Sequence, residues 1–166
     1  MWCASEDMPN PAISPQTVAP RALARSSGSP GKTRLINFYR VNEAFYLADL
    51  PGFGYAKVGQ EVRHDMAAAL RAYFDAALSL RGVLYLVDIR VPDSPVDHAA
   101  LEWILGREIP LLALAAKADK LNRSELAGAL GEISRRHGLP EDPLPISSLK
   151  KTGLEKLWEQ MEMLLA

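Results

Sequence analysis

The sequence is short of cysteine, net charge and long apolar runs, and each shortage excludes a class of protein. Cys3 is the single cysteine among 166 residues, so neither a disulfide framework nor a cysteine-based metal site can form. The histidines, His64, His98 and His137, share no metal-ligand spacing, and we expect them on the surface. A net charge of -1 offers no general attraction to nucleic acid or anionic lipid. Apolar runs such as residues 111–116 are far shorter than the roughly 18 residues that a membrane span needs, so we expect no membrane-spanning helix. We expect the protein to be cytoplasmic.

The sequence also lacks the phosphate-binding loop G-x-x-x-x-G-K-[ST] of many nucleotide-binding proteins. Residues 28–33, Gly-Ser-Pro-Gly-Lys-Thr, come near it, but their glycine spacing is too short and Ser26 stands where the first glycine belongs. A predicted strand follows them instead of a helix. Because the loop must wrap phosphates at a helix amino terminus, we predict that residues 28–33 are not such a loop.

Predicted strands and helices alternate along most of the chain. The predicted strands are residues 35–39, 45–48, 83–87, 111–115 and 144–146. The first two flank Asn42-Glu43 and predict an antiparallel hairpin, and the continuous apolar runs predict strands buried in a parallel sheet. The predicted helices are residues 62–78, 97–107, 122–136 and 152–165. This alternation is typical of a three-layer α/β/α domain.

The amino-terminal segment differs from the rest. Residues 1–20 carry four prolines and no apolar periodicity, which predicts a disordered tail. We expect one domain at residues 21–166, because a chain of this length builds one sizeable core and not two.

Short patterns predict where helices begin and end. Asn122 with Glu125, and Thr152 with Glu155, have the spacing of capping boxes, in which two side chains accept from backbone N–H groups of the first turn. Gly82 is expected to end the helix that precedes the strand at 83–87.

Polar residues follow the predicted strands at the point where each strand ends. Asp49, Asp88, residues 116–119 and residues 147–148 are placed in this way. Ligands of open α/β sheets bind beyond the carboxyl ends of the strands, so we expect these residues to converge on one rim. Asp88 by itself is as consistent with a loop or cap contact as with a ligand contact.

The pair Lys117-x-Asp119 has the groups that a guanine base requires. The Asp119 carboxylate can accept hydrogen bonds from guanine N1–H and from the exocyclic amine, a pair of donors that adenine does not have. The Lys117 stem can lie along the base plane, and backbone N–H groups around Ser147 and Ser148 can donate to guanine O6. The sequence therefore predicts a guanine-nucleotide site.

Asp49 and Gly52 suit the phosphate end of the same nucleotide. A carboxylate at a strand end can hold a water of bound Mg²⁺, and the N–H of a following glycine can approach the terminal phosphate unobstructed. We therefore expect GTP or GDP to bind together with Mg²⁺.

Four stretches carry a more specific pattern: ARSSGSPGKT at residues 24–33, INFY at 36–39, DLPGFGYAKV at 49–58 and VDIR at 87–90. They resemble the EngB (YsxC, YihA) family of bacterial P-loop GTPases. The resemblance implies the GTPase G-domain fold, a mostly parallel sheet with one antiparallel edge hairpin. Since the phosphate-binding loop has no counterpart, we expect an N-terminally truncated domain that lacks the first strand, that loop and most of the first helix.

The resemblance assigns roles to individual positions. It implies that Thr33 binds Mg²⁺ through its hydroxyl and that Asp49 binds the ion through water. Ala116 stands where the family has threonine, a side chain that tethers the base loop to the phosphate loop. The nucleotide-binding residues implied are Gly31, Lys32, Thr33, Arg34, Leu35, Asp49, Leu50, Pro51, Gly52, Ala116, Lys117, Ala118, Asp119, Ile146, Ser147 and Ser148.

The resemblance also implies a biological role. It points to assembly of the large ribosomal subunit, through contact with its RNA and proteins, and to normal cell division and septation, by a cytoplasmic monomer. No catalytic residue is assigned, because Phe53 stands where Ras-like enzymes place a water-orienting glutamine. Hydrolysis is expected to need another group or a partner.

Two other functions remain open. A chain without the phosphate-binding loop can act as a nucleotide-free pseudo-GTPase, a binding module. Strand-end acids with a strand-end lysine also occur in receiver domains, where Asp49 would accept a phosphoryl group and Lys117 would be its partner. An acidic pair after a first strand, which a receiver domain needs, is absent.

Overall fold

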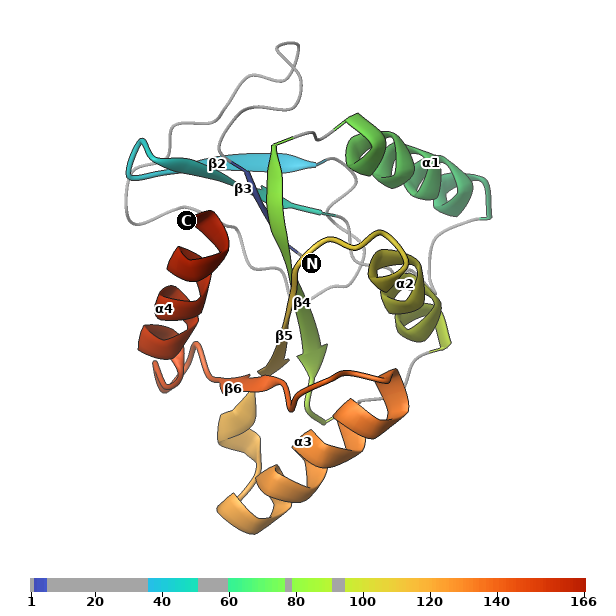
Figure 1. The fold of residues 1–166 in the computed structure, drawn as a ribbon. Coiled ribbons are helices and arrows are strands. Elements are labelled where there is room, and N and C mark those ends of the chain that lie inside the picture. The colour runs from blue at the N-terminus through green and yellow to red at the C-terminus, as the bar shows by residue number, and fades with distance from the viewer. Residues whose placement is uncertain (1, 6–35, 51–59, 77–78, 91–94) are drawn as a thin grey trace. The chain divides into compact units, whose positions relative to one another are not determined.

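The computed structural model describes residues 2–5, 36–50, 60–76, 79–90 and 95–166 (Figure 1). They belong to two compact units, Met1–Gly82 and Val83–Ala166. Each unit has its own strands, helices and core. Within the ranges described, no helix is both long and apolar enough to cross a membrane.

The first unit contains three antiparallel strands and a helix. These elements are β1 (Trp2–Ser5), β2 (Asn37–Val41), β3 (Phe45–Asp49) and α1 (Gln60–Ala76). Strand β3 pairs with β2 on one side and with β1 on the other. Both edges of β3 are therefore hydrogen-bonded, which suits a strand whose Ala48 is 1% exposed.

The connection between β2 and β3 is a tight hairpin. Asn42 and Glu43 have φ angles of 48° and 58°, and the Ala44 N–H donates to the Val41 carbonyl at 2.9 Å. Two successive residues with positive φ are typical of the turn that matches the twist of paired strands. The antiparallel hairpin predicted from the sequence is confirmed.

Strand β1 lies inside the segment predicted to be a disordered tail. Cys3 and Ala4 are 0% and 1% exposed, and burial raises the pKa of the Cys3 thiol to about 12. These small side chains precede the first proline, so nothing prevents the stretch from pairing with β3. The tail prediction is wrong for Trp2–Ser5, and a strand precedes the hairpin where none was expected. The rest of the predicted tail lies outside the described residues.

Helix α1 packs on the hairpin through aromatic side chains. The Tyr73 ring lies 5.9 Å from the ring of Phe38 and 5.6 Å from that of Phe74. The helix ends at Ala76, and Gly82 lies inside a strand, so the predicted stop at Gly82 is wrong. The strand begins at Leu80, so Arg81 and Gly82 are strand residues.

The second unit is parallel. Its elements are the end of β4 (Leu80–Asp88), α2 (Pro95–Leu105), β5 (Leu111–Ala116), the 3₁₀ helix η1 (Ala118–Lys120), α3 (Arg123–His137), β6 (Leu144–Ile146) and α4 (Leu154–Leu165). Strand β5 pairs in parallel with β4 and with β6. The predicted parallel pairing is therefore confirmed, and Val83, Leu84 and Tyr85 of β4 are buried, whereas Leu86 is 39% exposed.

Helices cover the strands of the second unit on both sides. Tyr85 and Val87 of β4 share one core with Leu101 of α2 and Ile133 of α3. Helix α4 buries Met161 and lies on the other side of β5 from α2 (Figure 1). This arrangement follows from strands that are apolar on both faces.

One predicted cap is present and one is not. The Asn122 side chain accepts from the N–H of Glu125, and Glu125 accepts from the N–H of Asn122, which is a full capping box. Helix α4 instead begins after Gly153, at φ 76°, with no side-chain cap, so the predicted Thr152–Glu155 box is wrong. Thr152 is held elsewhere, because its backbone pairs with Ser147.

His137 is also not where the sequence suggested. It is 5% exposed, its ring lies 6.4 Å from Tyr85 and 5.4 Å from His98, and the last turn of α3 directs it into the core. The surface prediction is therefore wrong for His137, while His64 and His98 are exposed. Within the described ranges, no three His, Cys, Asp or Glu side chains are grouped to hold a metal ion.

Candidate functional site

Three strand ends of the second unit lie level with one another. In the parallel register, Asp88 of β4 pairs with Ala116 of β5, and Ala116 pairs with Ile146 of β6. The residues that follow these positions are therefore neighbours. The predicted convergence on one rim is confirmed for this part of the site.

Lys117 turns the chain sharply as it leaves β5. Its φ and ψ are 64° and 33°, a left-handed conformation that few non-glycine residues adopt. From there the Lys117 Nζ donates to the Asp88 Oδ2 at 2.6 Å, and η1 carries Ala118 and Asp119. The lysine of the predicted base site is thus held by the end of the neighbouring strand.

Asp88 is itself held by Arg90. The Arg90 Nε and Nη2 donate to the two Asp88 oxygens at 2.9 and 2.7 Å, and the Arg90 backbone N–H donates at 3.1 Å. The Arg90 hydrogen bonds, with that of Lys117, keep the pKa of Asp88 well below its usual range. The sequence left the role of Asp88 open and did not single out Arg90. The signal that could have found the contact is the position of Asp88 at a strand end next to β5.

Asp119 is oriented by a buried hydroxyl. The Ser147 Oγ donates to the Asp119 Oδ1 at 2.5 Å, and Ser147 is 1% exposed. This hydrogen bond lowers the pKa of Asp119, with a smaller contribution from Lys120, whose Nζ lies 3.7 Å away. An ionised carboxylate has about four acceptor positions, of which Ser147 and Lys120 use part and the others can accept from a ligand. Asp119 can therefore accept two N–H groups of a guanine.

The loop after β6 is held by the backbone of Ser147. Its N–H donates to the Thr152 carbonyl at 3.0 Å, the Thr152 N–H donates back at 3.2 Å, and the Lys150 N–H donates to the Ser147 Oγ at 3.1 Å. The Ser147 N–H is therefore engaged with Thr152, which leaves the Ser148 N–H as the candidate donor to guanine O6. Ser148 is exposed beside it, and Ile146 is 8% exposed at the end of β6.

The chain matches a family model and many relatives. The model described as "50S ribosome-binding GTPase" matches residues 17–117. A probable GTP-binding protein EngB of Clostridioides difficile (strain 630) is 38% identical over 143 residues, which cover 85% of this chain and 70% of the relative. Another, of Alkaliphilus oremlandii (strain OhILAs), is 41% identical over 144 residues, 86% of this chain and 69% of that protein. The chain belongs to the EngB family of GTP-binding proteins.

Solved structures give this EngB-family chain the P-loop GTPase fold. A probable GTP-binding protein EngB superposes with a TM-score of 0.69 at 17% identity, over 80% of this chain and 84% of that one. Era, in complex with MgGDPNP and nucleotides of 16S ribosomal RNA, superposes with a TM-score of 0.67 at 21% identity, over 84% of this chain and 47% of Era. The receiver-domain alternative is thereby excluded.

The phosphate end of the predicted EngB site belongs to the first unit. Asp49 is the last residue of β3, where burial raises the pKa of its carboxyl group, and Leu50 is 2% exposed. The predicted residues Gly31, Lys32, Thr33, Arg34, Leu35, Pro51 and Gly52 lie outside the described ranges. A hydroxyl and a carboxylate are oxygen ligands that suit Mg²⁺, which keeps several waters, so Thr33 and Asp49 fit the ion by chemistry.

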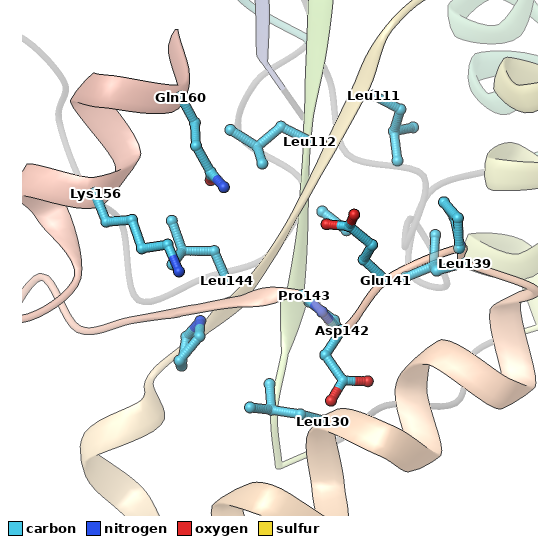
Figure 2. A pocket seen from close by; sticks show the side chains of 13 residues that line it. Leu111, Leu112, Leu130, Leu139, Glu141, Asp142, Pro143, Leu144, Lys156 and Gln160 are labelled. Carbon is cyan, nitrogen blue, oxygen red and sulfur yellow. The ribbon is translucent and has the colours of Figure 1, made fainter. Parts of the chain in front are cut away.

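The second unit also has a hollow of about 400 Å³ (Figure 2). Leu112 and Leu144 line it with apolar surface, and Glu141, Asp142 and Lys156 add charge. It lies at the start of β5, whereas the residues of the base site follow the end of that strand. The hollow therefore contributes nothing to base recognition.

Proposed function

We propose that the chain binds GDP and GTP in the EngB manner. Asp119 accepts from the guanine base, the Lys117 stem lies along the base plane, and the Ser148 N–H donates to guanine O6. Ala116, Ala118, Ile146 and Ser147 form the backbone and side-chain frame of this pocket. The observation that carries the proposal is the 2.5 Å hydrogen bond by which Ser147 orients the Asp119 carboxylate.

The same proposal places the phosphates and Mg²⁺ with the first unit. Thr33 binds the ion through its hydroxyl and Asp49 binds it through water. Gly31, Lys32, Arg34 and Leu35, with residues 50–52, face the phosphates. Bound Mg²⁺ neutralises phosphate charge. The presence of MgGDPNP in the solved Era complex supports this choice of ion.

The binding test is a titration with fluorescently labelled GDP in the presence of Mg²⁺. We expect micromolar affinity for GDP, and competition by GTP but not by ATP or ADP. Adenine lacks the N1–H and the 2-amino group from which the Asp119 carboxylate would accept hydrogen bonds. GTP turnover measured in the same samples would then show whether binding leads to hydrolysis. Equal competition by ADP would contradict the proposed base site.

We further propose that the chain acts in assembly of the large ribosomal subunit in the cytoplasm, and thereby in normal cell division and septation. The description of the matching family model, a 50S ribosome-binding GTPase, supports the partner. Co-sedimentation should therefore recover the monomeric chain with isolated large subunits and not with small subunits. Equal recovery of the chain with both subunits would contradict the proposed role in large-subunit assembly.

The absence of G-x-x-x-x-G-K-[ST] from the sequence favours a second candidate, a nucleotide-free binding module. Such a module would bind large subunits equally well with and without GTP, and would not bind labelled GDP. Micromolar GDP affinity would refute it.

A further inference from the structure

The Lys117 side chain of the proposed base site forms an ion pair with a residue of the neighbouring strand β4, Asp88. Its Nζ lies 2.6 Å from the Asp88 Oδ2, and Asp88 stands opposite Ala116 in the register of β4 and β5. We propose that Asp88 is a positioning residue for nucleotide binding: it holds the Lys117 stem where the base plane comes to lie. The inference rests on the proposed function and adds a residue outside the Lys117-x-Asp119 pair.

Asp88 is well suited to this task because it cannot rotate freely. Both carboxylate oxygens accept from the Arg90 guanidinium, at 2.9 and 2.7 Å, and Oδ1 also accepts from the Arg90 backbone N–H at 3.1 Å. Two parallel hydrogen bonds fix the plane of a carboxylate as well as its position. The Asp88 Oδ2 that accepts from the Lys117 Nζ therefore has a fixed position.

The benefit to binding comes from order imposed before the nucleotide arrives. A lysine side chain has four rotatable bonds, and a ligand that must immobilise it loses affinity through the lost rotamer freedom. The Lys117 side chain is 51% exposed, so without Asp88 it would sample many rotamers. Its ammonium group has three donors, and Asp88 uses one. Two remain for oxygens of the bound nucleotide.

A purely structural role for Asp88 makes a different prediction. If Asp88 only ties the end of β4 to Arg90, its loss lowers affinity whether or not Lys117 is present. If Asp88 acts through Lys117, its loss has no effect once the lysine ammonium is gone. In both cases the preference for guanine over xanthine stays unchanged, because Asp119 is untouched.

A double-mutant cycle with labelled GDP separates the two roles. We expect Asp88→Asn to weaken GDP binding about tenfold, within the range of coupling between contacting residues. Lys117→Met should weaken it at least as much, and adding Asp88→Asn to Lys117→Met should change the affinity less than twofold. The matched control is Glu132→Gln, which removes the carboxylate of an ion pair with Arg136 on α3, outside the site, and should leave affinity unchanged.

A second measurement reports on Lys117 without nucleotide. The folded chain is treated briefly with an amine-acylating reagent, and modification of Lys117 is measured by mass spectrometry relative to Lys156. We expect faster modification of Lys117 in Asp88→Asn than in the wild-type chain or in Glu132→Gln. Melting curves of each variant confirm that the labelled protein is folded.

The outcomes are distinct. Unchanged GDP affinity in Asp88→Asn, additive losses in the double variant, or unchanged labelling of Lys117 would each overturn the positioning role. A wild-type chain that does not bind GDP would overturn the proposed function, and with it this role. Tenfold weaker binding, a non-additive cycle and faster labelling together would establish it.

Discussion

Among single residues, the proposed base recognition depends on how two carboxylates, Asp119 and Asp88, are held. Asp119 is oriented by the buried Ser147 hydroxyl, and Asp88 is held by Arg90 and contacts Lys117. Hydrogen bonds to ionised groups are stronger than those between neutral groups. Loss of Ser147 or Arg90 should therefore change the position of the carboxylate that it holds.

Ser147→Ala tests the orientation of Asp119. Without the hydroxyl, the carboxylate loses a 2.5 Å hydrogen bond and must be ordered by the ligand, so GDP affinity should fall about tenfold in a fluorescence titration. Ser148→Ala is the matched control, because the proposed contact of Ser148 uses its backbone N–H. A loss of equal size in Ser148→Ala would contradict the assignment.

Asp119→Asn tests which groups of the base are read. An amide presents one acceptor and one donor group where the carboxylate presents only acceptors, so preference should shift from guanine to xanthine nucleotides. Competition between GDP and XDP for the labelled nucleotide measures this shift. Unchanged guanine selectivity would mean that another residue reads the base.

The low pKa of Asp88 predicts a pH dependence of stability. A carboxyl group whose folded pKa lies below its ordinary value of 3.8 stabilises the fold above that value, and this is lost as pH falls through the lower folded pKa. Urea unfolding should show Asp88→Asn to be less stable by about 1 kcal/mol, a modest value because solvent screens the contact. The difference should be constant from about pH 8 to pH 5 and shrink only below about pH 4. A difference that shrinks near neutral pH would point to another group.

Among the structural elements, the loop between β6 and α4 is closely packed, and this packing fixes the position of Ser147. Ser147 and Thr152 exchange backbone hydrogen bonds, and Gly153 then turns the chain into α4 with φ 76°. A Cβ added at Gly153 would lie 2.3 Å from the Pro145 carbonyl oxygen. This glycine is required by both its conformation and its surroundings.

Gly153→Ala should therefore destabilise the protein by at least about 2 kcal/mol, from the left-handed conformation and the backbone clash together. Gly128→Ala is a matched control inside α3, where an added Cβ meets nothing within 4 Å. It should stabilise the helix by about 0.5–1 kcal/mol. Chemical denaturation of both variants measures the difference, and a neutral Gly153→Ala would show that the loop can rearrange.

For the molecule as a whole, the proposed function predicts that nucleotide binding raises the stability of the folded chain. A ligand that binds only the folded chain stabilises it in proportion to its saturation.

GDP with Mg²⁺ should raise the melting temperature of the chain. At 100 times the dissociation constant the gain is about 2.7 kcal/mol, or roughly 5–10 °C for a protein of this size. ADP at the same concentration should give no shift, and EDTA should reduce the GDP shift because bound Mg²⁺ would no longer neutralise phosphate charge. An equal shift with ADP would contradict guanine recognition.

Much of the second unit was predictable because its signals are local. Continuous apolar runs marked β4 and β5, and Asn122 with Glu125 marked the start of α3. Predictions failed where a tertiary contact outweighed the local pattern. Thr152 does not cap α4 because its backbone pairs with Ser147, and His137 is buried because α3 faces Tyr85. The site residues in the first unit outside the described ranges remain predictions.

Residue type and spacing along the chain were enough to predict the family, the strand-end order of the site and the Lys117-x-Asp119 pair that we propose reads the base. How that pair is held depends instead on contacts between residues far apart in the sequence. The contacts of Asp88 with Lys117 and of Ser147 with Asp119 join residues 29 and 28 positions apart, and they exist because parallel pairing brings separate strand ends level. Spacing along a chain carries no record of that register.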